Sequence, residues 1–155
     1  MSLSFRLKGI AMARLVFICI FVISPVTALA ADELSDDKAM RGTWTPIKAE
    51  LSGRPWSEDE FKAIALKLND GKYEVSVAGQ LDRGTYTLDS KSTPKEMTIT
   101  GSDGPNKGKT FLCIYELSGD TLRVCYDLSG KKTPTEFATA KGTPLYLVTY
   151  TRKQE

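Results

Sequence analysis

Residues 64–77 read IALKLNDGKYEVSV, and this stretch decides the fold. Apolar and polar side chains alternate on both sides of Asn69-Asp70-Gly71, which is a strong signal for a tight turn between two strands. A period of two places one face of each strand in a core and the other face in solvent. The stretch therefore predicts an antiparallel β-hairpin.

The same pattern continues in both directions from this hairpin, with turn residues at roughly 8–12-residue spacing. Strands are expected at residues 42–51, 63–68, 72–78, 81–88, 96–100, 111–117, 121–128, 135–139 and 145–152. Ser57 and Glu60 fit a capping box, which predicts one short helix at 58–62 after the first strand. Short connections without long crossovers favour an all-β, antiparallel up-and-down barrel of about 8 strands. An immunoglobulin-like sandwich is the alternative.

The N-terminal residues have the pattern of a secretory signal peptide. Basic residues precede a short apolar run, and an Ala-x-Ala motif at 28–30 offers a cleavage site. The run is shorter than the ~20 residues of a membrane span, although an uncleaved anchor remains the alternative. We therefore expect a signal peptide at 1–30, a polar leader at 31–40 and one barrel domain at 41–153. The mature protein would be periplasmic or extracellular, without a stable membrane span.

Composition excludes several kinds of chemistry. The chain has no histidine, so it can contain no Ser-His or Cys-His nucleophile, no histidine-ligated zinc and no imidazole acid or base. Lys and Arg number 21 against 19 Asp and Glu, and the segment 1–30 holds three of the bases and none of the acids. The mature chain is then nearly neutral, which argues against nucleic acid as a partner. We expect no enzyme, cofactor or metal, and a monomer.

The two cysteines outside the signal, Cys113 and Cys125, predict a disulfide in an exported chain. They flank the turn signal at residues 118–120. If Leu117 pairs with Thr121, the two cysteines face each other and can be bridged. A register shifted by one residue would place them on opposite faces as two free thiols.

The candidate ligand contacts are side chains that the alternation directs towards the barrel interior. They are Tyr73, Tyr86, Glu116 and Tyr126. An eight-stranded barrel is either filled by side chains or holds one small ligand. The sequence thus leaves two functions open: binding of a small apolar or amphipathic molecule, or a solid-cored envelope or extracellular interaction protein.

A glycine-rich segment, Gly104-Pro-Asn-Lys-Gly-Lys-Thr110, is one residue short of a phosphate-binding loop. A strand pattern follows it, whereas a phosphate loop requires a helix N-terminus at that point. The segment is better interpreted as a connection between strands.

Gly42-Thr43-Trp44 resembles the Gly-x-Trp signature of lipocalins. The resemblance implies that Trp44 closes one end of the barrel and that a basic residue from a late strand packs over it. Arg152 is the expected partner, with Arg123 as the second choice.

A narrower resemblance covers residues 40–152. Its segments include Leu66–Tyr73, Gly84–Tyr86, Ile114–Leu122 and Pro134–Phe137. Together they resemble a planctomycete-type family of uncharacterised, exported, lipocalin-like proteins. The resemblance implies a small β-barrel and supplies no activity, ligand or catalytic residue. Its pattern includes a cysteine at Cys125 but does not require one at Cys113.

Overall fold

The computed structural model describes residues 35–77 and 79–154, so the expected signal peptide lies outside the described residues. Of the expected polar leader, the described part at 35–40 is helical. The remaining elements are β1 (Gly42–Leu51), β2 (Arg54–Pro55), α2 (Glu58–Phe61), β3 (Ile64–Asn69), β4 (Lys72–Val77), β5 (Gln80–Asp89), β6 (Lys95–Asp103), β7 (Thr110–Ser118), β8 (Thr121–Asp127) and β9 (Leu145–Arg152).

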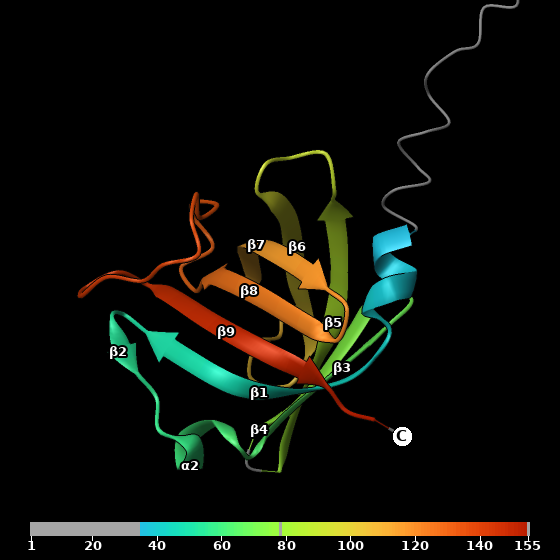
Figure 1. Cartoon of the computed structure of the whole chain (residues 1–155), viewed down its shortest axis with the longest axis horizontal. Coiled ribbons are helices and arrows are strands. Elements are labelled where there is room, and N and C mark those ends of the chain that lie inside the picture. The colour runs from blue at the N-terminus through green and yellow to red at the C-terminus, as the bar shows by residue number, and fades with distance from the viewer. Residues whose placement is uncertain (1–34, 78, 155) are drawn as a thin grey trace, which may run out of the picture.

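The strands form a closed antiparallel barrel (Figure 1). From β3 to β9 each strand pairs with the next one in sequence, and β1 pairs with both β3 and β9. The two-residue β2 pairs only with the end of β1. The expected up-and-down barrel of eight strands is therefore confirmed, and the sandwich alternative is wrong.

The predicted short helix is present as α2, one residue shorter than expected. The backbone N–H of Ser57 donates to the Glu60 carboxylate at 2.7 Å, as the capping box requires. The Arg54 guanidinium and this backbone N–H lower the pKa of Glu60 to about 2. Phe61 is buried, which fixes the helix on the barrel.

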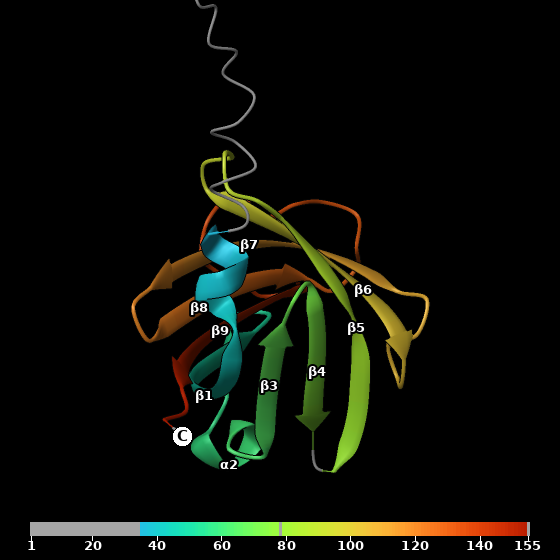
Figure 2. The ribbon, with the colours of Figure 1, turned by 90° about the vertical axis from the view of Figure 1, so that its right-hand side faces the viewer.

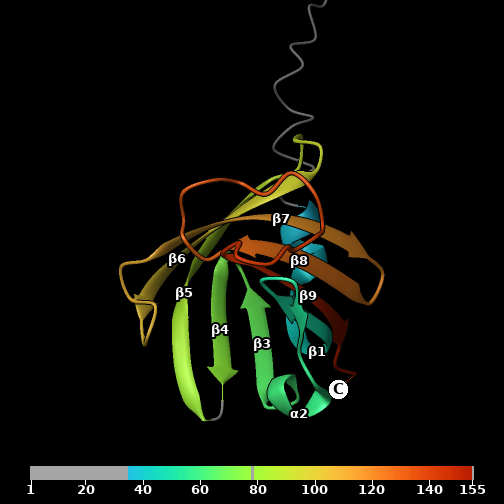
Figure 3. The same ribbon diagram turned by 90° about the vertical axis from the view of Figure 1, so that its left-hand side faces the viewer.

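The two ends of the barrel differ. The helical residues 35–40 cover the end that faces the viewer in Figure 2. Figure 3 shows the opposite end, where the β8–β9 loop (residues 128–144) and the β1–β2 turn lie at the edge. One end is therefore capped by chain that precedes β1, whereas only connections border the other.

The expected strand at 135–139 is wrong, because this segment forms part of the β8–β9 loop. Asp127 and Leu145, on either side of the loop, already pair with each other, so no free strand edge remains beside it. The buried carboxylate of Asp127 accepts hydrogen bonds from the backbone N–H groups of Ser129, Lys131 and Lys132. Burial raises the pKa of Asp127, but a hydrogen bond from the Ser129 hydroxyl, together with these backbone donors, outweighs it and lowers that pKa overall.

The expected disulfide is also wrong, because the β7–β8 register differs by one residue. Ser118 pairs with Thr121, so Cys113 lies opposite Tyr126 while Cys125 lies opposite Ile114. The turn therefore holds two residues instead of three, and a slip of one residue reverses the face of every side chain. Both thiols are free and buried. Burial raises the pKa of Cys125 to about 11 and that of Cys113 well above its ordinary value.

Candidate functional site

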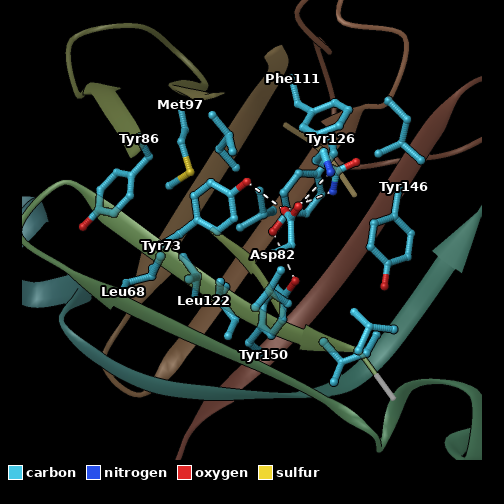
Figure 4. A pocket seen from close by; sticks show the side chains of 18 of the residues that line it. Leu68, Tyr73, Asp82, Tyr86, Met97, Phe111, Leu122, Tyr126, Tyr146 and Tyr150 are labelled. Carbon is cyan, nitrogen blue, oxygen red and sulfur yellow. Dashed lines mark hydrogen bonds between the residues drawn. The ribbon is translucent and has the colours of Figure 1, made fainter. Parts of the chain in front are cut away.

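A cavity of about 350 Å³ lies inside the barrel (Figure 4). Inward side chains from every strand of the closed barrel line it, and most of them are apolar or aromatic. The volume falls in the lower part of the range of small-molecule sites, roughly 300–1,000 Å³. The barrel is therefore not completely filled by its own side chains.

Trp44 and Arg152 close one end of the barrel. Trp44 is 0% exposed, and its indole N–H donates to the Met40 carbonyl at 2.8 Å. The Arg152 guanidinium lies 4.2 Å from the centre of the Trp44 ring and donates to the carbonyls of Ala39 and Arg41. The structure thus places these two residues in the arrangement that the lipocalin resemblance implies.

Arg123, the second choice for this role, lies elsewhere. It projects from the outer face of β8, 4.7 Å from the centre of the Phe137 ring in the β8–β9 loop. It also donates to the Phe137 carbonyl at 3.0 Å. Arg123 therefore holds the loop against the barrel and has no part in closing its end.

Acidic residues of the helical segment 35–40 hold it across the closed end. Asp36 accepts a hydrogen bond from the Tyr115 hydroxyl, and Asp37 accepts one from the Tyr86 hydroxyl, both at 2.6 Å. Arg41 pairs with Asp37 at 3.0 Å. Burial raises the pKa of Asp37, but the hydrogen bonds from Tyr86 and Arg41 outweigh it and lower that pKa overall. The ring of Tyr86 thus lines the cavity while its hydroxyl binds the helical segment.

The cavity reaches the surface at the opposite end. Val77 and Leu128 line it and are also exposed, by 47% and 42%. Leu51 and Trp56 continue this apolar rim. Exposed apolar side chains that border a cavity are typical of a site that receives an apolar partner.

A polar cluster centred on Asp82 interrupts the apolar wall (Figure 4). Asp82 is only 5% exposed and accepts a hydrogen bond from the Tyr73 hydroxyl at 2.8 Å. Asn106 donates to it twice, from its backbone N–H at 2.8 Å and from its side-chain amide at 3.1 Å. Burial and the neighbouring Asp82 carboxylate both raise the pKa of Tyr73. The Tyr73 hydroxyl therefore stays protonated and donates to the carboxylate.

The glycine-rich connection after β6 places Asn106 in this cluster. Gly104 has φ +88°, and a Cβ atom there would lie 2.5 Å from the carbonyl oxygen of Leu81. Only glycine combines this backbone conformation with so close an approach to β5. Packing of the loop against β5 thus explains why this segment contains glycine. This agrees with the interpretation of the segment as a connection between strands.

A second polar group in the cavity consists of three tyrosines. The hydroxyls of Tyr126 and Tyr150 lie 3.1 Å apart and share a hydrogen bond. The centres of the Tyr146 and Tyr126 rings lie 5.7 Å apart. No described residue forms a hydrogen bond with the Tyr146 hydroxyl. Burial raises the pKa of all three, that of Tyr150 to about 12, so they remain neutral donors near pH 7.

Of the expected ligand contacts, the structure brings Tyr73, Tyr86 and Tyr126 together in the cavity wall. Glu116 lies outside, because the β7–β8 register places it opposite Arg123 on the outer face, with its side chain 61% exposed. Its carboxylate is 3.9 Å from the Arg123 guanidinium. The expectation that Glu116 shares a face with the inward residues of β8 is therefore wrong.

Sequence reasoning missed Asp82 and Asn106 as site residues. Asp82 could have been found, because it alternates with Gly84 and Tyr86 on the inward face of β5. Asn106 lies in a loop without periodicity, and no local signal indicates that it folds over the barrel.

Residues 35–77 and 79–154 contain no cluster of three or more Cys, Asp or Glu side chains suited to a metal ion. No helix in the same residues has the length and apolar character of a membrane span.

No family model, curated protein or solved structure matches this chain. We therefore infer function from the cavity and from the residues that line it.

Proposed function

We propose that this protein is an exported, lipocalin-like barrel that binds one small apolar or amphipathic molecule in its cavity. The observation that carries the proposal is the cavity of about 350 Å³, lined mostly by apolar side chains. The signal-peptide pattern supports export, and the resemblance to planctomycete-type proteins supports membership of such an exported family.

The cavity is suited to binding because its walls do not have to form around the ligand. Trp44 and Arg152 close one end, and the continuous β-ladder holds the walls apart. Each ~100 Å² of apolar ligand surface removed from water contributes ~2.5 kcal/mol. A preformed site spends less of this energy on ordering its own groups.

Binding explains the interior better than catalysis does. The chain has no histidine, and Asp82 is the one acidic side chain among the described residues that line the cavity. Glycoside hydrolysis by a pair of carboxylates requires two such groups, roughly 5–9.5 Å apart. The alternative of a solid-cored interaction protein fits less well, because a solid core would leave no space of this size.

A cavity-filling variant tests the proposal with a neutral apolar fluorophore, N-phenyl-1-naphthylamine. Ile99 points into the cavity, and the next residue, Thr100, is exposed on the outer face of β6. We expect the wild-type protein and Thr100→Trp to bind the fluorophore saturably at one site, and Ile99→Trp to lose this binding.

Thermal melting of each variant verifies that it is folded. Native mass spectrometry of protein purified from its own host then identifies the natural ligand by mass. Failure of the folded wild-type protein to bind the fluorophore or any co-purified molecule would refute the proposal.

A further inference from the structure

We infer that the ligand is a cation: an amphipathic amine or quaternary ammonium compound whose charged group lies beside Asp82. The inference rests on the proposed binding function and adds the chemical class of the ligand. Three features of the cavity carry it, namely the partners of Asp82, the absence of basic groups in the lining, and the aromatic walls.

Neutral groups supply all the observed hydrogen bonds to the Asp82 carboxylate. Its donors are the Tyr73 hydroxyl and the two N–H groups of Asn106. A carboxylate has about four acceptor positions, so roughly one remains for a ligand. Across residues 35–77 and 79–154, no Lys or Arg forms an ion pair with Asp82.

The described cavity lining contains no lysine or arginine. The Asp82 carboxylate, only 5% exposed, thus has hydrogen-bond partners but no counter-charge in this lining. An ammonium group in the cavity would supply that counter-charge, whereas an anionic ligand would be repelled. The charge of the cavity therefore distinguishes between ligands that share the same apolar portion.

The cavity wall that contains Asp82 is rich in aromatic rings (Figure 4). The Tyr73 hydroxyl donates to Asp82, and Phe111, Tyr126 and Tyr150 line the same cavity. The π-face of an aromatic ring attracts a cation, and tyrosine hydroxyls accept hydrogen bonds from an ammonium group. The aliphatic portion of the same ligand would contact the apolar side chains between this position and the rim.

Asp82 also has a structural role, because its hydrogen bonds anchor the loop that carries Asn106. If Asp82 only anchored this loop, ligands of equal length and different charge would bind with similar affinity. Selectivity between ligands of equal length and different charge therefore separates the two roles.

The experiment compares octylammonium, octanol and octanoate as competitors of the bound fluorophore. We expect wild-type protein at pH 7 to bind octylammonium about tenfold or more tightly than octanol, a difference of ~1.4 kcal/mol. Octanoate should bind most weakly. Octyltrimethylammonium should retain the preference if the aromatic rings contribute, since it has no N–H group.

Asp82→Asn should abolish the preference for octylammonium over octanol, measured as the ratio of the two dissociation constants within the same variant. Glu116→Gln is the matched control, because it removes one carboxylate from the outer face and should leave the preference unchanged. If Asp82→Asn does not fold, the wild-type comparison of the three octyl compounds decides the question by itself.

Equal binding of the three octyl compounds would overturn the inference while leaving the proposed function intact. Loss of the preference in both Asp82→Asn and Glu116→Gln would also overturn it, because a general effect of net charge would then explain the selectivity. Absence of binding by every compound would instead refute the proposed function, and the inference with it.

Discussion

Removal of the Arg152 guanidinium should destabilise the barrel through its contact with Trp44. Arg152→Met keeps much of the aliphatic volume of the side chain but loses the charge over the ring and the hydrogen bonds to Ala39 and Arg41. Trp44→Ala removes the other partner of this contact. The two substitutions and their combination form a double-mutant cycle that isolates the contact.

The structure sets the size of each effect. Trp44 is completely buried, and truncation of such a side chain costs ~3–5 kcal/mol. A cation over an aromatic ring contributes ~0.5–2 kcal/mol, and each hydrogen bond from a charged donor ~1.5–3 kcal/mol before allowance for solvent. Because the Arg152 side chain is 23% exposed, we expect Arg152→Met to cost about 2 kcal/mol, with a coupling of ~1 kcal/mol to Trp44.

Urea denaturation followed by circular dichroism measures these changes in the free energy of unfolding. In thermal denaturation, at ~4 °C per kcal/mol for a domain of this size, Trp44→Ala should lower the melting temperature by roughly 12–20 °C. Arg123→Met is the control, because this guanidinium lies over Phe137 on the outer face and should show no coupling to Trp44. Unchanged melting of Trp44→Ala, or equal coupling of Arg123 and Arg152 to Trp44, would refute the closure argument.

Three further predictions test other parts of the structure. Reductant should leave the melting temperature unchanged, and a thiol reagent should label Cys113 and Cys125 only after denaturation. A stabilising disulfide between these two residues would contradict the observed β7–β8 register. Gly84→Ala should cost about 1–3 kcal/mol in urea denaturation, because a Cβ atom there would overlap the carbonyl of Thr100; no loss would show that the strands can separate. The pKa of Asp127 is lower in the folded protein, so its carboxylate stabilises the fold at neutral pH and this contribution is lost as the pH falls below about 4. Asp127→Asn should therefore destabilise more at pH 7 than near pH 3, and equal losses at both would disprove the linkage.

Local alternation predicted most of the barrel, because each strand has one buried and one solvated face. The bounds of β1 and β9 agree with the sequence prediction, and the Asn69-Asp70-Gly71 turn joins β3 and β4. These features depend on neighbouring residues alone. Most of the tyrosines in the cavity wall follow from the same alternation.

The errors arose where pairing depends on a single residue or on distant segments. Gly119 and Asp120 alone form the turn after β7. Counting Ser118 into that turn shifted Cys113 and Glu116 of β7 by one position relative to Cys125 and the rest of β8. Alternation cannot detect such a slip when both faces of a strand carry apolar residues. The contact between Asp82 and Asn106 likewise joins positions 24 residues apart, and a loop without periodicity brings them together.

The pairing of β1 with β9 has a consequence for how the molecule is assembled. These strands lie at opposite ends of the barrel sequence, yet Trp44 is the direct neighbour of Arg152 in the ladder. During synthesis the barrel cannot close until its final strand has been made, and until then β1 and β8 each present an unpaired edge. The entropic cost of joining such distant segments must be met before their contacts form, which predicts slow folding with ring closure as a late step. Truncation within β9 should therefore leave an open sheet that associates through its edges.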